Sequence, residues 1–359
     1  MTYEKAFIVS RSDIRSFKTE TSENATPLGD GEVLMKVDQF SFTANNITYA
    51  AFGDAMKYWD FFPANDGWGT VPVWGFADVV ESNSGDVSVG ERFYGYFPMS
   101  SHLRVTPAKA SANGFFDGAA HRQHLSPIYN YYSNTKTDPG YNAEQEALQM
   151  LFRPLFMTSF LIDDFLDDNG FYGAKQVVLS SASSRTAYGL AFQLAQRSDI
   201  KVIGLTSDRN MAFVEGLGCY DKTVTYDNVS ELDASLPTVY VDMAGSGPVR
   251  AAVHTHFAEN LKYSCSVGAS HWDDRGSNED LPGAKPTLFF APSQGQKRSK
   301  DWGEAGMQQR TGTAWLKFVE FAGKLTTVVE SKGEDAISSV YTDTLTGNTN
   351  PTEGNILSF

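Results

Sequence analysis

The chain has 359 residues, is 41% hydrophobic and carries a formal net charge of −14. This length is long for a single domain and predicts two. The acidic balance argues against nucleic acid as a partner, because a phosphate backbone is bound by basic patches. No basic run suited to an anionic membrane surface occurs either.

Three features of the sequence indicate the cellular compartment: the N-terminal residues, the length of the apolar runs and the number of cysteines. Residues 1–17 place charges inside their apolar stretch and show no small-residue cleavage site, so no signal peptide is expected. The apolar runs fall well short of the ~20 residues that a membrane helix needs. Cys219 and Cys265 are too few for a disulfide framework or a four-thiolate zinc site. These features predict a soluble cytoplasmic protein.

The first 150 residues predict a β-rich module. Glycine, proline and asparagine separate short segments of strand character at 5–10, 31–42, 71–97 and 101–107. Val33, Met35 and Val37 alternate with polar neighbours, which is the period of a strand with one buried face. We therefore expect residues 1–150 to form one domain.

Two further segments accompany this module. The tail, residues 325–359, is expected to return to it as a strand through the terminal "GNILSF". Residues 121–141, "HRQHLSPIYNYYSNTKTDPGY", are rich in tyrosine and show no periodicity, so they predict a loop.

From residue 176 the pattern changes to strands and helices in alternation. Apolar strands are expected at 176–181, 201–206, 222–226, 238–245 and 261–268. Helices are expected at 184–197, 208–218 and 247–259. This alternation predicts parallel βαβ units and a doubly wound sheet over residues 151–324, a Rossmann domain entered by a linking helix. The fold class is therefore α/β, with a cleft expected between two domains.

In dinucleotide-binding folds, the turn between the first strand and the first helix binds the phosphates. In this chain the corresponding turn follows the strand expected at 176–181. Dinucleotide folds use glycines here, whereas this chain has Ser181, Ser183, Ser184 and Thr186. Hydroxyls and backbone N–H groups at a helix N-terminus can still bind an anion, and Arg185 adds a positive charge. In the alternative interpretation, Ser183 or Ser184 only caps the helix.

The end of the second strand indicates which nucleotide would bind. Enzymes that use NAD place a carboxylate here for the ribose hydroxyl, while those that use NADP place small hydroxyls and an arginine. This chain has Thr206, Ser207 and Arg209, with Asp208 between them. Asp208 could instead cap the next helix, with Arg209 in a solvated first turn. The hydroxyls and the arginine favour NADPH over NADH.

Taken in order, these segments resemble the medium-chain dehydrogenase/reductase superfamily, on its zinc-free quinone and enoyl reductase side. The similar stretches are "GEVLMKVDQFSFTANNITYAAFG", "VPVWGFADVVESNSGDVSVGERFYGYF", "VIGLTSDRNMAFVEGLGCYDKTVTYD", "VDMAGSG" and "GNILSF". Zinc-dependent members carry Gly-His-Glu where this chain has Trp74-Gly75-Phe76-Ala77, so no metal is expected.

The resemblance implies a GroES-like N-terminal module and several site residues. Asn45, Tyr49 and Tyr58 fall where related reductases contact their substrate, and Tyr49 or Tyr58 is expected to donate the proton. Independently of the resemblance, Tyr131 and Tyr132 of the tyrosine-rich segment are expected to cover the site as a lid, with Tyr132 contacting the substrate. Tyr226 stands where the family has a tyrosine after the cofactor strand, and is expected to bind the cofactor.

The predicted function is an NADPH-dependent, zinc-independent reduction of a carbonyl or a conjugated C=C in a small molecule. Two alternatives stay open: a zinc-free alcohol dehydrogenase working in the oxidative direction, and a non-catalytic NADPH-binding sensor or interaction protein. A homodimer is also left open. The sequence does not identify the substrate.

Overall fold

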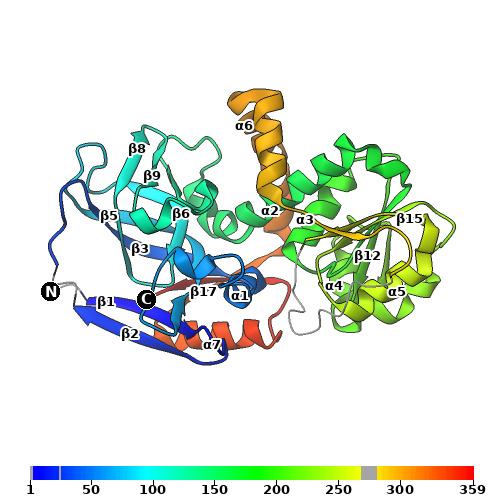
Figure 1. Ribbon diagram of the computed structural model, residues 1–359, viewed down its shortest axis with the longest axis horizontal. Helices are drawn as coiled ribbons and strands as arrows, with labels where there is room; N and C mark the ends of the chain where they lie inside the picture. The colour runs from blue at the N-terminus through cyan, green and yellow to red at the C-terminus, as the bar shows by residue number, and fades with distance from the viewer. Residues whose placement is uncertain (1–2, 24–25, 268–280) are drawn as a thin grey trace. The chain divides into compact units, whose positions relative to one another are not determined.

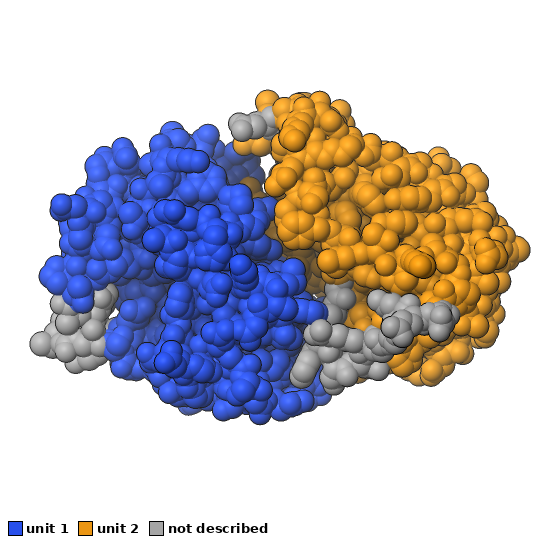
Figure 2. All heavy atoms as spheres, viewed as in Figure 1, with its two compact units in different colours: residues 1–151, 326–359 blue, residues 152–325 orange. Residues whose placement is uncertain are grey.

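The computed structural model describes residues 3–23, 26–267 and 281–359. The chain divides into two compact units: unit 1 comprises residues 1–151 and 326–359, and unit 2 comprises residues 152–325 (Figure 2). Among the described residues, no helix is both long enough and apolar enough to cross a membrane.

Unit 1 is built on two sheets, a small one in the order β2-β1-β4 and a large one in the order β17-β18-β3-β5-β6-β10-β9-β8, with β7 also paired to β3. The strands are β1 Tyr3–Ser10, β2 Phe17–Glu23, β3 Val33–Phe42, β4 Trp68–Thr70, β5 Pro72–Ser82, β6 Arg92–Pro98, β7 His102–Val105, β8 Pro107–Ser111, β9 Gly114–Asp117, β10 Tyr131–Asn134, β17 Thr327–Lys332 and β18 Glu353–Ser358.

The end of the chain joins this large sheet. β18 runs antiparallel to β3, pairing Ile356 with Ser41, and β17 runs parallel to β18. Helix α7 (Glu334–Leu345) connects them and lies beside β1 and β2 in Figure 1. It buries Ile337 and Tyr341, four residues apart and so on one face, and the Tyr341 ring lies 5.1 Å from that of Phe7.

Unit 2 holds a parallel sheet in the order β13-β12-β11-β14-β15-β16. Its strands are β11 Gln176–Leu179, β12 Lys201–Thr206, β13 Lys222–Thr225, β14 Thr238–Asp242, β15 Leu261–Ser266 and β16 Pro286–Leu288. The order reverses at β11, from which the chain first moves toward β13 and then toward β16. This arrangement is the doubly wound sheet that the sequence predicts, and the α/β fold class is confirmed.

The remaining helices differ in part from expectation. They are α1 Ala44–Ala51, α2 Glu146–Asp168, α3 Arg185–Leu194, α4 Met211–Gly216, α5 Gly247–Phe257 and α6 Ala291–Leu325. The short helical turns are η1 Tyr58–Asp60, η2 Ala120–Arg122, η3 Pro127–Tyr129, η4 Ala143–Gln145, η5 Gly170–Gly173, η6 Asp208–Asn210, η7 Tyr226–Glu231 and η8 Ala258–Asn260. The helix expected at 208–218 is divided into η6 and α4. The long helix α6, orange in Figure 1, is interrupted at Gly303, where φ is 71° and ψ is 169°, and it was not predicted.

The expectation of a loop over 121–141 is wrong, because this segment contains β10. There Tyr132 is fully buried, so it is a core residue and not a lid. Its hydroxyl donates to the Tyr96 carbonyl at 2.8 Å and accepts from Arg122 at 2.9 Å. Alternation failed as a signal because the strand has only four residues.

Arg122 organises the turns before β10. Its guanidinium is fully buried and forms an ion pair with Asp117 at 3.0 Å. It also donates to the Asn130 side chain at 2.8 Å and to the Tyr129 carbonyl at 2.7 Å. A buried charge is stable only when it is paired and hydrogen-bonded in this way.

Gly95 on β6 makes room for the Tyr132 ring. A Cβ at this position would lie 2.4 Å from Cδ1 of Tyr132. We expect Gly95→Ala to lower the free energy of unfolding by about 1–3 kcal/mol through overpacking. Denaturant unfolding measures the change. Gly85→Ala is the control, because its Cβ would meet nothing within 4 Å; equal effects of the two variants would contradict the packing described for Tyr132.

Candidate functional site

Ser180 organises the turn that joins β11 to α3. Its hydroxyl donates to Asp242 Oδ1 at 2.9 Å and accepts from the backbone N–H groups of Met243 and Ala244, both at 3.0 Å. The carboxyl ends of β11 and β14 are therefore tied together. In doubly wound sheets, this edge is where nucleotides bind.

Asp242 is the buried charge on which this edge is built. The residue is 1% exposed, accepts from the Gly245 N–H at 2.9 Å and pairs with Arg250 at 3.2 Å. These donors offset the cost of removing the carboxylate from water.

Ser181 and Tyr226 close the turn from the other side. Ser181 has φ = 51°, the left-handed region that glycine adopts most easily, and holding a serine there costs roughly 1–2 kcal/mol. Its N–H donates to the Tyr226 hydroxyl at 3.1 Å. Tyr226 is thus placed beside the turn, against its backbone.

Ser183 and Ser184 have different surroundings, although both are partly exposed. Ser184 is the N-cap of α3 and accepts from the Ala187 N–H at 3.3 Å. Ser184 therefore does cap the helix. Ser183 accepts from the Asn210 side chain at 3.0 Å, which connects the turn to the segment after β12.

Two glycines take over the packing that a glycine-rich turn normally provides. A Cβ on Gly189 would lie 2.8 Å from the Ser159 hydroxyl of α2, which donates to the Thr186 carbonyl at 2.7 Å. A Cβ on Gly204 of β12 would lie 3.0 Å from the Ala182 Cβ. The turn thus packs closely against α2 and β12 without the family's glycines. The Arg185 guanidinium lies 5.6 Å from the Phe152 ring.

The predicted nucleotide residues after β12 lie at the same edge of the sheet. Thr206 is 1% exposed, and its hydroxyl has no hydrogen-bond partner among the described residues. Ser207 is partly exposed, and Asp208 and Arg209 are exposed on η6. An unpartnered buried hydroxyl and an exposed arginine leave this edge suited to a polar, anionic ligand.

In unit 1, the structure gathers Tyr49 and Tyr58 with residues that the sequence analysis missed. The tyrosine cluster, as we define it here, consists of Tyr49 on α1, Tyr58 on η1, Trp74 on β5, Tyr96 on β6 and Tyr129 on η3. Phe61 and Phe62 pack against it. Five separate elements supply these rings, so no spacing in the sequence reveals the cluster.

The rings of the tyrosine cluster are in mutual contact. The centroid of Tyr49 lies 4.5 Å from that of Tyr58 and 5.6 Å from that of Tyr96. Tyr96 also lies 4.7 Å from Tyr129 and 5.1 Å from Trp74. Trp74 and Tyr129 are partly exposed, and the other three are buried.

Burial raises the pKa of all four tyrosines well above the usual value, and their hydroxyls raise it further for one another. For Tyr49, the side chains of Trp74, Asn45 and Tyr96 lower the pKa in part. The four phenols therefore remain protonated through the physiological range and act as hydrogen-bond donors rather than bases.

Two polar atoms of the cluster lack hydrogen-bond partners among the described residues, Trp74 Nε1 and the Tyr96 hydroxyl. Both atoms are buried, and buried polar groups are nearly always hydrogen-bonded in native proteins. Asn45 is partly exposed at the start of α1, and its backbone N–H donates to Thr43.

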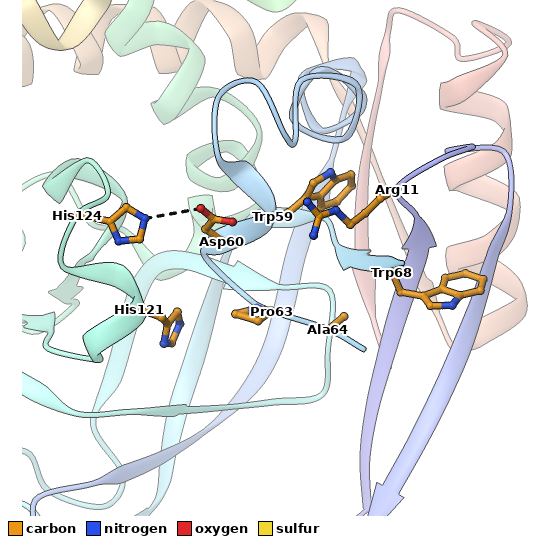
Figure 3. Close-up of a pocket in the computed structure, with 8 residues that line it drawn as sticks. All are labelled: Arg11, Trp59, Asp60, Pro63, Ala64, Trp68, His121 and His124. Atoms are coloured by element: carbon orange, nitrogen blue, oxygen red, sulfur yellow. Dashed lines mark ion pairs between the residues drawn. The ribbon is translucent and has the colours of Figure 1, made fainter. Parts of the chain in front are cut away.

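A separate pocket includes Trp59 and Asp60 of η1 in its lining (Figure 3). It is lined by Arg11, Trp59, Asp60, Pro63, Ala64, Trp68, His121 and His124. Its polar groups lie next to one another or to other side chains: Asp60 Oδ2 lies 3.6 Å from His124 Nε2, and Arg11 pairs with Asp54. The tyrosine cluster is the stronger candidate site, because it alone of the two combines buried donors with unmet hydrogen bonds.

The histidines do not belong to a metal-ligand group in the part of the chain that the structure describes. His254 is buried, with Nε2 2.9 Å from the Ser264 hydroxyl and Nδ1 2.9 Å from the Pro282 carbonyl. Burial lowers the pKa of His254 and keeps it neutral. Within residues 3–23, 26–267 and 281–359, no group of three or more His, Cys, Asp or Glu side chains could hold a metal ion.

A β-rich unit and a doubly wound unit with this turn together define the fold of the medium-chain reductases, as the sequence predicted. CurA from Vibrio vulnificus in complex with NADPH is 12% identical, with a TM-score of 0.64 over 99% of this chain and 98% of that one. A putative NADPH:quinone reductase from Mesorhizobium loti is 12% identical, with a TM-score of 0.63 over 100% of both chains. A mutant form of enoyl thioester reductase from Candida tropicalis is 12% identical, with a TM-score of 0.55 over 100% of both chains.

At these identities the similarity shows the fold. The family model described as "Protein of unknown function (DUF2855)" matches residues 40–350, and the chain belongs to this family. No curated protein matches it.

The raised pKa values predict how stability depends on pH. A tyrosine in the unfolded chain ionises at pH ~10, whereas the tyrosines of the cluster ionise only above that value. Their contribution to the free energy of unfolding is therefore complete below pH ~10 and is lost as the pH rises further. We expect Tyr58→Phe to make the alkaline fall in stability shallower, by up to about 1.4 kcal/mol per pH unit. Denaturant unfolding at a series of pH values measures the slope, and an unchanged slope would contradict the shift.

Proposed function

We propose that this protein is an NADPH-dependent, zinc-independent reductase of carbonyl compounds or conjugated alkenes. The observation that carries the proposal is the carboxyl edge of the unit 2 sheet. There the serine turn, the unpartnered Thr206 hydroxyl and the exposed Arg209 follow two adjacent strands. CurA and an enoyl thioester reductase of the same fold were solved with NADPH or NADP, which supports the cofactor.

The residues of this edge fit NADPH by their chemistry. The N–H groups at the start of α3, together with Ser181, Ser183, Ser184, Arg185 and Thr186, would hold the pyrophosphate. Thr206 and Tyr226 would contact the adenosine part, and Ser207 and Arg209 would bind the extra phosphate of the ribose. When bound, NADPH supplies a hydride to an electrophilic carbon of the substrate and is oxidised to NADP⁺.

The tyrosine cluster is proposed as the substrate site of the same reaction. As the carbon accepts the hydride, the π electrons of the C=O or C=C move onto oxygen, and that oxygen or the adjacent carbon then takes a proton. A protonated Tyr49 or Tyr58 can donate that proton, and Asn45 would orient the substrate. Tyr132 has no part in this proposal, because its hydroxyl is committed to Tyr96 and Arg122.

The protonation state of the cluster suits the proton-donating step of a reduction. Burial raises the pKa of Tyr49 and Tyr58 above the usual range, so both phenols carry the proton that this step requires. The non-catalytic sensor remains the rival from another class. Tight NADPH binding without turnover of any enone, quinone or aldehyde would support it.

The cofactor assignment predicts that NADPH binds more tightly than NADH. A charge-assisted hydrogen bond contributes about 1.5–3 kcal/mol, so Arg209→Ala should reduce the preference roughly tenfold or more. Calorimetry with both nucleotides measures it. Lys201→Ala, at the opposite end of β12, removes the same charge and should leave the preference intact. Equal affinities of the unmodified protein for the two nucleotides would reject the assignment.

The substrate assignment predicts that catalysis depends on the tyrosine cluster. Tyr49→Phe or Tyr58→Phe keeps the ring and removes the proton donor. In the variant that lacks the true proton donor, kcat should fall about 10²–10⁴-fold, with NADPH affinity unchanged. NADPH consumption with an enone, quinone and aldehyde panel gives the rates. Tyr131→Phe is the control, since its hydroxyl donates to the Asn113 carbonyl outside the cluster. If both variants keep the kcat of the parent, the proton comes from another donor.

A further inference from the structure

The two unpartnered donors of the tyrosine cluster indicate what part of a ligand they would bind. Trp74 Nε1 can only donate a hydrogen bond, so the atom that satisfies it must be an acceptor. The Tyr96 hydroxyl is also without a partner among the described residues, and its ring lies 5.1 Å from the Trp74 ring. The Tyr96 ring also lies 5.6 Å from the Tyr49 ring.

We propose that Trp74 Nε1 and the Tyr96 hydroxyl together bind and polarise the carbonyl oxygen of a flat, uncharged substrate such as an enone or a quinone. This inference rests on the proposed function for the reaction, in which that oxygen gains negative charge as the carbon accepts the hydride. Two N–H or O–H donors directed at such an oxygen stabilise the charge as it develops, without a metal ion.

The surroundings of the donors account for the substrate's shape and charge. The members of the tyrosine cluster and the flanking Phe61 and Phe62 are all aromatic and uncharged. The nearby Arg122 guanidinium lies 4.9 Å from the Phe62 ring and is already paired with Asp117. A carboxylate or phosphate on the substrate would find no unpaired cation in the cluster, whereas a planar conjugated system can stack on the rings.

The unmet hydrogen bonds also have a cost in the folded protein. A buried hydroxyl without a partner destabilises the folded state, so its removal is neutral or stabilising. Tyr96→Phe deletes only that oxygen. If the Tyr96 hydroxyl served folding alone, its removal would lower the stability of the protein. The unfolding of Tyr96→Phe is therefore a readout that does not depend on activity.

The test uses para-dimethylaminocinnamaldehyde, a flat neutral aldehyde whose visible absorption moves to longer wavelength when donors polarise its oxygen. We expect this shift on binding to the full chain without NADPH. Trp74→Phe and Tyr96→Phe should each lose about half of it and the double variant all of it, because one or both donors are gone. Tyr131→Phe should keep the whole shift, and Tyr96→Phe should unfold at no lower denaturant concentration than the parent.

The possible outcomes separate this inference from the proposed function. An unshifted spectrum with the parent, or a full shift with Tyr96→Phe, overturns the inference even if NADPH is consumed in turnover. A shift that depends on Tyr96 supports it even if no NADPH is consumed, in which case the proposed function alone fails. Since Tyr96→Phe removes a single unpartnered atom, the test does not depend on whether Trp74→Phe folds.

Discussion

The carboxylate of Asp242 is the constraint on which the nucleotide edge of unit 2 depends. A charge that is 1% exposed must be fully hydrogen-bonded, and its donors come from the turn after β11, from the turn after β14 and from α5. Satisfying this one group fixes Ser180, and with it the start of the serine turn. The turn can therefore keep a serine in left-handed geometry at Ser181, because the surrounding contacts determine its backbone.

Unit 1 carries the opposite kind of constraint, since its candidate site is built from polar groups that folding leaves unsatisfied. Packing four phenols and an indole together buries a large aromatic area, which favours folding. The unmet donors of Trp74 and Tyr96 oppose it. Such a balance is common at binding sites, where a ligand supplies the missing hydrogen bonds and stability is sacrificed for recognition.

The sequence predicted most of the fold and part of the candidate site. The parallel strands of unit 2 are recognisable because each is a buried apolar run followed by a helix, and Tyr49 and Tyr58 were found through the resemblance. Tyr96, Trp74 and Tyr129 were missed, because contacts between five elements leave no periodic trace. Tyr132 was misassigned, because a four-residue strand is too short to display alternation. Its signal was Gly95, a glycine inside a strand, which often marks a close approach.

The buried Arg122 has a consequence for how the candidate site forms during folding. Its partners lie at most 10 residues away along the chain, so the segment closes on itself through short loops. The entropy lost in closing a loop grows with its length, and these closures are therefore among the least costly in unit 1. Tyr129 is positioned by a locally closed segment, whereas Tyr49 and Tyr96 depend on elements joined across the sheet. Insertions elsewhere in the β-rich unit can thus accumulate without displacing Tyr129 from its own segment.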